Sequence, residues 1–403
     1  MNIGFVTTWL PRGAAYVTIN YIKLIEDCHK AFIYARGGEY FDENFNYNDV
    51  PVHKGLRLEG TNIDNKDFIK WIKSNQIDIV LLNEQNSIEA VCEAKKECAN
   101  VIFGSYIDYY KESTINDFKI YDFLICNTKR HMSVFDWHPQ CLYFPWGTDI
   151  DLYTPSMEKD DVEKVVFFHS MGMSERKGTK ELLNVFVNNK MSKLGAKLII
   201  HTQKSISHLI SNDDASKNGI EIICKSAPAP GLYYLGDVYV YPAKLDGLGL
   251  TMYEALSCGL PVIATDVAPM NEVINNSNGK LVKVKKSFAR SDGYYWPLAV
   301  IDEESLKTSM LYYIQNANRI SEFSYYARQY AVDNLNLMDR RETIQDYLSK
   351  VKRLDTTAFE EKWKYQYVKR KKAIRNHFLI SLFPTKLESY IREHIEKVRK
   401  NNG

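Results

Sequence analysis

The chain has 403 residues, of which 45% are hydrophobic and 25% are charged, and its formal net charge is +2. This composition is that of a globular, soluble protein, and the length suits two lobes plus an appendage better than one core. The small net charge offers no bulk electrostatic argument for binding nucleic acid.

The cysteines and the first residues predict a cytoplasmic protein. Seven cysteines are scattered along the chain without a C-x-x-C pair, which fits a reducing compartment better than a disulfide framework or a metal site. Met1 and Asn2 lead directly into an apolar run, which predicts a first strand rather than a signal peptide. No apolar run approaches the ~20 residues that a membrane-spanning helix needs.

Short apolar runs alternate with segments of helical periodicity through residues 1–148. Near-continuous runs such as Ile77–Leu82 are typical of strands buried on both sides, and alternating strands and helices imply a parallel sheet. The expected strands lie near 2–7, 30–35, 77–82, 100–104, 122–126 and 141–145. The expected helices lie near 15–26, 65–75, 86–97 and 128–135.

A stretch punctuated by Pro and Gly, Phe144–Asp149, predicts a linker before a second lobe at 149–335. Strands are expected there near 164–169, 197–201, 220–224, 237–241, 261–264 and 279–284, with helices near 179–188, 250–258, 269–275 and 302–316. The predicted fold class is therefore α/β, with two doubly wound Rossmann-like lobes. Their cleft would lie at the carboxyl ends of both sheets, where such folds bind ligands.

Residues 336–403 are expected to form a helical return segment and a basic tail. Asp339 and Glu342 have the spacing of a capping box that would start a helix. Seven Lys and Arg residues lie between 362 and 375, with aromatic residues among and after them. Two interpretations stay open: an interfacial segment attracted to anionic lipid, and a helix packed across the lobes with one solvated basic face.

The densest functional signal begins at Tyr241, where a predicted strand ends and a loop carrying Asp246 follows. Gly247 and Gly249 would let backbone N–H groups approach a ligand closely. A helix starting near Leu250 would point its positive end at the same place, with Glu254 about one turn inside. The two carboxylates would then contact two parts of one extended ligand.

An anionic ligand beside two carboxylates needs a cation, and the stretch Ser174–Thr179 supplies Arg176 and Lys177. This stretch follows a predicted strand, so it should reach the same edge of the sheet as Asp246. A lysine in such a strand-to-helix loop pairs with a diphosphate as a point charge.

Lys177-Gly178, the stretch from Asp246 to Glu254, and Gly259–Ala264 together resemble glycosyltransferase family 4, the glycosyl transferases group 1. That family carries a lysine-glycine pair and two acids separated by seven residues. The resemblance implies a GT-B fold, a nucleotide-diphosphate sugar as co-substrate, retention of anomeric configuration, and no required metal or other cofactor.

The resemblance also implies roles for individual residues. Lys177 would hold the donor diphosphate, Asp246 would meet the sugar and its reacting end, and Glu254 would bind the ribose hydroxyls. Backbone N–H groups of the loop would contact sugar and phosphate; these belong to Gly247, Leu248, Gly249 and Leu250. Gly13, in the first lobe, would let the diphosphate approach a helix N-terminus.

Three positions depart from the family pattern. The usual Gly-Arg before the lysine is replaced by Met171-Gly172, which makes Arg176 the candidate source of the missing charge. The first acid is Asp246 rather than Glu, so its reach is one methylene shorter. Asn83-Glu84-Gln85 occupies the region where many members carry a first-lobe His, and we therefore assign no catalytic histidine.

The acceptor is expected on the first lobe, where Tyr106–Tyr110 follows a predicted strand. Tyr106 would stack on a sugar and Asp108 would bind hydroxyls or a proton, although ordinary loop packing explains the segment equally well. The expected reaction transfers a sugar to a saccharide or lipid-linked acceptor, in cell-surface polysaccharide or glycoconjugate synthesis, with a peripheral membrane contact through the tail and no nucleic acid partner. Three alternatives stay open: a catalytically degenerate nucleotide-sugar-binding partner of a polysaccharide assembly complex, a GT-B-like sugar-nucleotide epimerase, and a glycogen-type phosphorylase.

Overall fold

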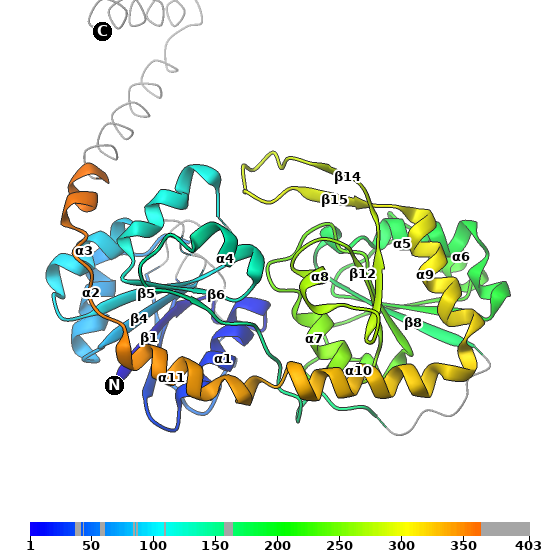
Figure 1. The fold of residues 1–403 in the computed structure, drawn as a ribbon, viewed down its shortest axis with the longest axis horizontal. Helices are drawn as coiled ribbons and strands as arrows, with labels where there is room; N and C mark the ends of the chain where they lie inside the picture. The colour runs from blue at the N-terminus through cyan, green and yellow to red at the C-terminus, as the bar shows by residue number, and fades with distance from the viewer. Residues whose placement is uncertain are drawn as a thin grey trace, which may run out of the picture. The chain divides into compact units, whose positions relative to one another are not determined.

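The computed structural model describes residues 1–36, 42, 44–56, 61–83, 85, 88–108, 110–156 and 164–363. Residues 1–353 form one compact unit, which contains two large parallel sheets (Figure 1). The chain from Leu354 belongs to a second unit, in which residues 357–363 are helical. Most of the basic tail predicted from the sequence lies outside the described residues.

The first sheet has seven parallel strands in the order β3-β2-β1-β4-β5-β6-β7. Helices cover both of its faces. Ile3 and Phe5 join the core on the face of α1, whereas Gly4 leaves room for Trp71 of α2, because a Cβ at Gly4 would lie 2.4 Å from the indole ring. The elements are β1 (Asn2–Thr7), α1 (Gly13–Ile25), β2 (Lys30–Ala35), β3 (Val52–Lys54), α2 (Asn65–Ser74), β4 (Ile79–Asn83), α3 (Glu89–Glu97), β5 (Ile102–Ile107), a 3-10 helix (Glu112–Ile120), β6 (Phe123–Cys126), α4 (Lys129–Phe135) and β7 (Cys141–Tyr143).

The second sheet has six parallel strands in the order β10-β9-β8-β11-β12-β13. Alternate side chains again enter two cores: Phe168 and Tyr239 face α7, whereas Phe167 and Val240 face the side of α5 and α9. The elements are β8 (Val165–Gly172), α5 (Thr179–Asn188), β9 (Ala196–Thr202), α6 (Asn212–Lys217), β10 (Ile220–Cys224), β11 (Val238–Tyr241), α7 (Leu250–Ser257), β12 (Val262–Thr265), α8 (Met270–Val273), β13 (Gly279–Val282) and α9 (Glu303–Gln315). An antiparallel hairpin of β14 (Val284–Phe288) and β15 (Leu298–Ile301) stands apart from this sheet.

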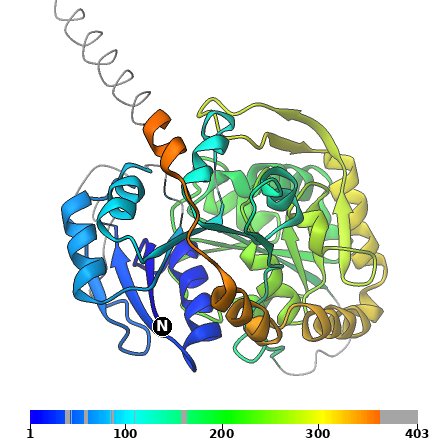
Figure 2. The same cartoon turned by 60° about the vertical axis from the view of Figure 1, so that its left-hand side comes forward.

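The chain crosses between the two sheets twice, and the two crossings run side by side. Thr148 on the outward crossing pairs with Asn336 on the return, and a Cβ at Gly147 would lie 2.9 Å from the Cα of Leu337. Before the return, α10 (Ile320–Asn334) packs on α7; after it, α11 (Arg341–Lys350) packs on α1 (Figure 2). Two adjacent crossings make a short hinge-like connection between the lobes.

The predicted fold class is confirmed: two doubly wound parallel lobes are followed by helices. The sequence missed β3, α6 and the β14–β15 hairpin. The capping box predicted at Asp339 and Glu342 is wrong, because α11 begins at Arg341 and the Asp339 carboxylate instead accepts a hydrogen bond from the Asn336 side chain at 2.8 Å. The division of the chain at 148 and 335 stays a prediction.

Candidate functional site

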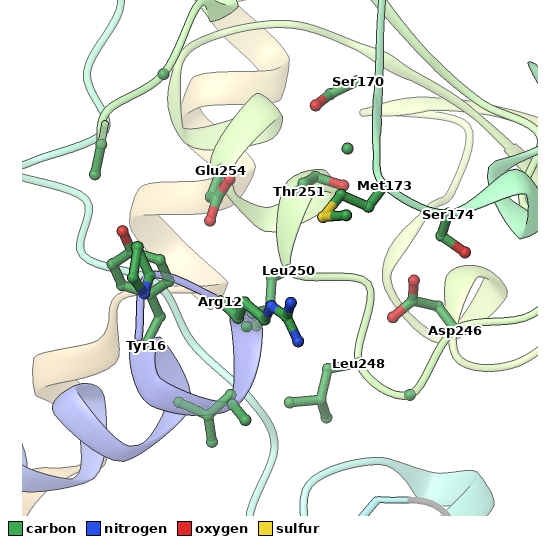
Figure 3. Close-up of a pocket in the computed structure, with 18 of the residues that line it drawn as sticks. Arg12, Tyr16, Ser170, Met173, Ser174, Asp246, Leu248, Leu250, Thr251 and Glu254 are labelled. Carbon is green, nitrogen blue, oxygen red and sulfur yellow. The ribbon is translucent and has the colours of Figure 1, made fainter. Parts of the chain in front are cut away.

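A cavity of about 740 Å³ lies where the carboxyl ends of the two sheets face each other (Figure 3). In each sheet the strand order reverses beside the first strand, between β1 and β4 and between β8 and β11. Thr8 follows β1, Asn83 ends β4 and Gly172 ends β8, and all three line the cavity. Such switch points are the places where open α/β sheets bind ligands.

Asp246 is held in a dense set of polar contacts at one wall of this cavity. Its Oδ2 accepts from the Lys177 ammonium at 2.5 Å and from the Tyr241 hydroxyl at 2.6 Å. Its Oδ1 accepts from the backbone N–H of Gly249, the residue that precedes α7, at 3.0 Å. The Asp246 and Lys177 side chains are each 18% exposed, so solvent screens their ion pair only weakly.

These contacts keep Asp246 ionised. Burial acts to raise the pKa of its carboxyl group, but the charge of Lys177 and the hydrogen bonds from Lys177, Tyr241 and Gly249 outweigh burial. The net result is a pKa well below the ordinary value for aspartate. Asp246 is therefore a fixed negative charge at neutral pH.

Glu254 occupies a different environment, one turn inside α7. Its carboxylate accepts from the Tyr153 hydroxyl at 3.1 Å and from the Tyr233 hydroxyl. Burial raises the pKa of Glu254 above its ordinary value, even though both tyrosine hydrogen bonds and the charge of Lys177 act in the opposite direction. Figure 3 shows this carboxylate directed into the cavity.

Gly178 explains why a glycine must follow Lys177. Its φ of +75° is a left-handed conformation, and a Cβ there would lie 2.1 Å from the carbonyl oxygen of Pro242. The loop that carries Lys177 therefore packs directly on the loop that leads to Asp246. The close packing at Gly178 thus helps to place Lys177 beside Asp246, with which it forms the ion pair.

Two helix N-termini face the cavity. Gly249 precedes α7 and Arg12 precedes α1, and neither helix has a side-chain cap. Gly13, the first residue of α1, lies close to α7, because a Cβ built on it would be 3.7 Å from Leu250 Cδ1. Uncapped N–H groups and the positive ends of two helices make a favourable place for an anion.

The structure gathers most of the predicted site residues at one cavity. Two exceptions are Lys177 and Gly249, which do not line it; Lys177 instead approaches Asp246 within its wall. The predicted residues that line the cavity are Gly13, Tyr106, Asp108, Arg176, Asp246, Gly247, Leu248, Leu250 and Glu254.

The stacking role predicted for Tyr106 is wrong. Its side chain is 3% exposed, its ring packs 5.0 Å from the ring of Tyr21, and its hydroxyl lies 2.9 Å from the Thr18 hydroxyl. The ring is therefore part of the first-lobe core and cannot offer a face to a sugar. Asp108 does line the cavity, whereas Tyr109 lies outside the described residues.

Sequence reasoning missed several residues that line the cavity or hold its acids. Arg12 lines it, and Figure 3 shows the guanidinium group pointing into it. The position of Arg12 just before α1 was the available signal, since a cation there lies beside a helix N-terminus. The sequence gave no signal for three tyrosines that hold the acids. Tyr153 and Tyr233 contact Glu254, which is distant in sequence, and Tyr241 contacts Asp246 through the fold of the loop between them.

The first lobe also contacts the loop of the second lobe that carries Asp246. Arg130 of α4 donates to the carbonyl oxygens of Asp246 at 2.7 Å, Gly247 at 3.3 Å and Ala268 at 2.7 Å. Glu272 of α8 in turn accepts from the backbone N–H groups of Lys129 at 2.6 Å and Arg130 at 2.9 Å. These reciprocal bonds position the Asp246 loop from the opposite lobe.

The described residues also bear on metal binding and on membrane insertion. The described part of the chain holds no group of three or more His, Cys, Asp or Glu arranged to bind a metal ion. Within the same residues, none of the helices combines the length and apolarity needed to cross a bilayer.

The residues of this site lie in a region that matches a known protein family. The sequence pattern of glycosyl transferases group 1 matches residues 163–291, which contain Lys177, Asp246 and Glu254. The match lies within the second lobe, which is therefore similar to glycosyl transferases group 1. The family resemblance that the sequence motifs predicted is therefore confirmed on the lobe that carries them.

Short stretches also resemble two curated proteins. Sucrose synthase 6 of Arabidopsis thaliana is 38% identical over 72 residues, which cover 15% of this chain and 8% of the relative. O-antigen chain mannosyltransferase B of Escherichia coli is 40% identical over 48 residues, which cover 12% of this chain and 13% of the relative. The chain thus matches only a small part of the length of either protein.

One solved structure illustrates how far the fold extends. The Anabaena protein HepE, solved with UDP and glucose, aligns with a TM-score of 0.66 at 15% identity and covers 87% of this chain and all of that one. At this identity the likeness shows the fold, and it places both lobes of the chain in the GT-B class.

Proposed function

We propose that this chain is a retaining glycosyltransferase that transfers a sugar from a nucleotide-diphosphate donor. The observation that carries the proposal is the cavity of about 740 Å³, in which two carboxylates flank two helix N-termini. A nucleotide sugar has a diphosphate between two hydroxyl-rich rings, so it needs positive charge at its centre and acceptors at its ends. The cavity offers that order of groups.

The donor diphosphate would lie at the start of α7 and α1, beside Arg12 and Arg176, which line the cavity. Glu254 would accept from the ribose hydroxyls, because its carboxylate points into the cavity and is positioned by two tyrosines. Asp246 would meet the transferred sugar. HepE, which shares the fold, was solved with UDP and glucose, and this supports a donor of the same class.

The chemistry needs no group beyond the two substrates in this proposal. The bond between the anomeric carbon and the diphosphate oxygen breaks, the acceptor oxygen bonds to the same face of that carbon, and the acceptor proton passes to the departing diphosphate. Lys177 and the helix N-termini stabilise the charge that develops on the leaving group. Asp246 remains ionised and orients the sugar.

The acceptor would be a saccharide or a lipid-linked saccharide used in cell-surface polysaccharide or glycoconjugate synthesis. Similarity to O-antigen chain mannosyltransferase B supports this assignment. The basic and aromatic tail would then give a peripheral contact with the inner face of a membrane. Removing the residues after Thr356 is expected to reduce recovery with anionic vesicles while donor-induced thermal stabilisation is kept.

A binding-only function is the second candidate, because Gly172 stands where the family arginine is usual and Lys177 is paired with Asp246. Thermal denaturation with UDP-, GDP- and ADP-linked sugars identifies the donor, since a ligand at 100 times its Kd adds about 2.7 kcal/mol of stability. Turnover of that donor, lost in both Lys177→Ala and Glu254→Gln, supports the enzyme. Tight binding without turnover or hydrolysis for any acceptor supports the binding-only protein instead.

A further inference from the structure

The β14–β15 hairpin is a feature that the donor site does not use. It follows β13 and leaves the second sheet (Figure 1). Four of the five residues of β14 are exposed. Two large apolar side chains near its tip, Phe288 and Tyr295, are 45% and 40% exposed. Exposed aromatic residues gathered on one projection are a common sign of a binding surface.

The tip of this hairpin is attached to the first lobe through Tyr110. The backbone N–H of Tyr295 donates to the Tyr110 carbonyl at 2.9 Å, and Trp296 Nε1 donates to the Tyr110 hydroxyl at 2.8 Å. The rings of Tyr110 and Tyr295 stack at 5.6 Å, and Tyr294 forms a β-bridge with Lys111. The hairpin therefore extends from one lobe to the other and is fixed there.

A hollow of about 370 Å³ lies at the hairpin tip, and among the described residues Glu112 is its one lining residue from the first lobe. The Tyr294 ring in its wall is flanked by two cations, with Arg290 Cζ at 4.9 Å and Lys111 Nζ at 5.5 Å from the ring centroid. The hollow is lined by a carboxylate, a guanidinium group and aromatic rings: Glu112, Arg290, Phe288, Tyr294, Tyr295 and Pro297 are among its residues.

This combination of groups suits a sugar ring. The C–H face of a saccharide packs on aromatic rings, and its hydroxyls donate to carboxylates such as that of Glu112. The Arg290 guanidinium already donates to Asp292, so its part here is to hold the Tyr294 ring. Tyr295 stacks on Tyr110, and Tyr294 lies between two cations, so these two rings would lose little side-chain freedom on binding.

A short segment of the first lobe, from Asp108 to Glu112, links the donor cavity to the hollow. Asp108 touches the donor loop, because a Cβ built on Gly247 would lie 2.0 Å from its Oδ1. Glu112, four residues later, lines the hollow. Four residues span at most about 14 Å when extended, so Glu112 lies within the reach of an oligosaccharide whose end is beside Asp108.

We propose that the hollow between Glu112 and the β14–β15 hairpin is a saccharide subsite, which binds inner sugar units of an acceptor whose terminal unit lies in the donor cavity. This inference rests on the proposed glycosyltransferase function. It assigns to the second lobe a part in acceptor recognition, because the hairpin carries most of the ring faces.

The test uses gluco- and manno-oligosaccharides from mono- to hexasaccharide as probes, with the full chain and three variants. Phe288→Ser and Glu112→Gln change the hollow, and Tyr325→Ser removes an aromatic that is 63% exposed on α10 as a matched control. Binding is measured by saturation-transfer NMR without donor, and transfer is measured with saturating donor.

The wild type and the control are expected to bind longer oligosaccharides at least about tenfold more tightly than the monosaccharide, a difference of about 1.4 kcal/mol. Both hollow variants should lose this dependence on length, while donor hydrolysis and donor affinity stay unchanged. Phe288→Tyr, which keeps a ring, should retain the dependence on length.

Equal affinity for all lengths in the wild type would overturn the subsite, as would unchanged length dependence in both hollow variants. Loss of binding to phosphatidylglycerol vesicles in these variants, without oligosaccharide binding by the wild type, would assign the hairpin to a lipid surface instead. Absence of donor binding and hydrolysis in the wild type would reject the proposed function, and the NMR arm would still decide whether the hollow binds sugars.

Discussion

Asp246 lies just before α7 and Glu254 lies one turn inside it, and both line the same cavity. Asp246 is bound by an ammonium, a hydroxyl and a backbone N–H, and its pKa is lowered. Glu254 is bound by two tyrosine hydroxyls without a directly contacting cation among the described residues, and its pKa is raised. A pair of acids with opposite shifts indicates two separate roles.

The two acids also differ in what holds them. The loop of Asp246 is fixed from the first lobe by Arg130, so its position depends on how the lobes meet. Glu254 belongs to a helix, and its tyrosine partners come from the second lobe and the chain that leads into it. The position of Asp246 therefore depends on both lobes, and that of Glu254 on the second lobe and the chain that leads into it.

The largest expected effect is that of Lys177→Ala, which removes the cation from the Asp246 side of the comparison. Asp246 loses its ion pair and the site loses charge beside the departing diphosphate. By analogy with loss of one oxyanion donor, kcat should fall by about 10²–10³. Steady-state turnover of the identified donor measures this.

Lys197→Ala is the matched control, because Lys197 pairs with Glu221 at 2.6 Å on the exposed edge of β9 and β10. Exposed pairs of this kind contribute about 0–1 kcal/mol, so kcat should not change. Equal kcat in Lys177→Ala and the wild type would show that the Lys177 pair is only structural.

Neutralising each acid in turn should weaken function in both cases, but only the change at Asp246 should lower stability. In Glu254→Gln, nucleotide affinity should fall by about 10–100-fold, the size of a hydrogen bond to a charged group. The same change removes a buried charge, so the melting temperature at neutral pH should not fall. Asp246→Asn should lower the melting temperature, because Lys177 is left without its partner.

The pH dependence follows from the same shifts. The pKa of Asp246 is lowered in the folded protein, so its stabilising contribution is present above the ordinary carboxyl pKa and is lost as pH falls through the lowered value. The pKa of Glu254 is raised, so the cost of ionising it is present above the raised value and absent below the ordinary one. Melting curves and nucleotide calorimetry across pH measure both, and a lower melting temperature for Glu254→Gln than for Asp246→Asn would contradict the comparison.

The sequence predicted those features of the two acids that depend on neighbouring residues. Gly247, Gly249 and the residues after them correctly predicted a loop that carries Asp246 and a helix that carries Glu254, since neighbouring residues specify both elements. The partners were not predictable, because Arg130 and Tyr153 meet the acids only after distant segments fold together. The β14–β15 hairpin was missed for another reason: its exposed first strand lacks the apolar pattern of a buried one.

Substitution of Arg130 tests whether the position of the Asp246 loop depends on the first lobe. Arg130→Gln removes the donors that hold the carbonyl groups of Asp246, Gly247 and Ala268, so the donor loop should shift. We expect kcat to fall about tenfold, the cost of misplacing a reacting group by a fraction of an ångström to an ångström. Nucleotide affinity should change little, because Glu254 is held within the second lobe.

Arg130→Lys keeps one donor and the charge, and should recover part of kcat. Arg319→Gln is the control, because Arg319 pairs with the surface residue Glu322 and lies over the Phe323 ring, and it does not line the cavity. Equal losses of kcat and nucleotide affinity in Arg130→Gln would show a general loss of structure rather than a positioning role.

The smallest expected effect is that of Tyr153→Phe, which removes one of the two hydroxyls on Glu254. Nucleotide affinity should fall about two- to fivefold, since a single hydrogen bond contributes about 0.5–1.5 kcal/mol and Tyr233 still donates to the carboxylate. The hydroxyl favours the ionised form, so its loss should raise the pKa of Glu254 further and move the acid limb of nucleotide binding to higher pH. Tyr325→Phe, on the exposed face of α10, should move neither quantity. An acid limb unchanged by Tyr153→Phe but abolished by Glu254→Gln would mean that Tyr233 alone positions this acid.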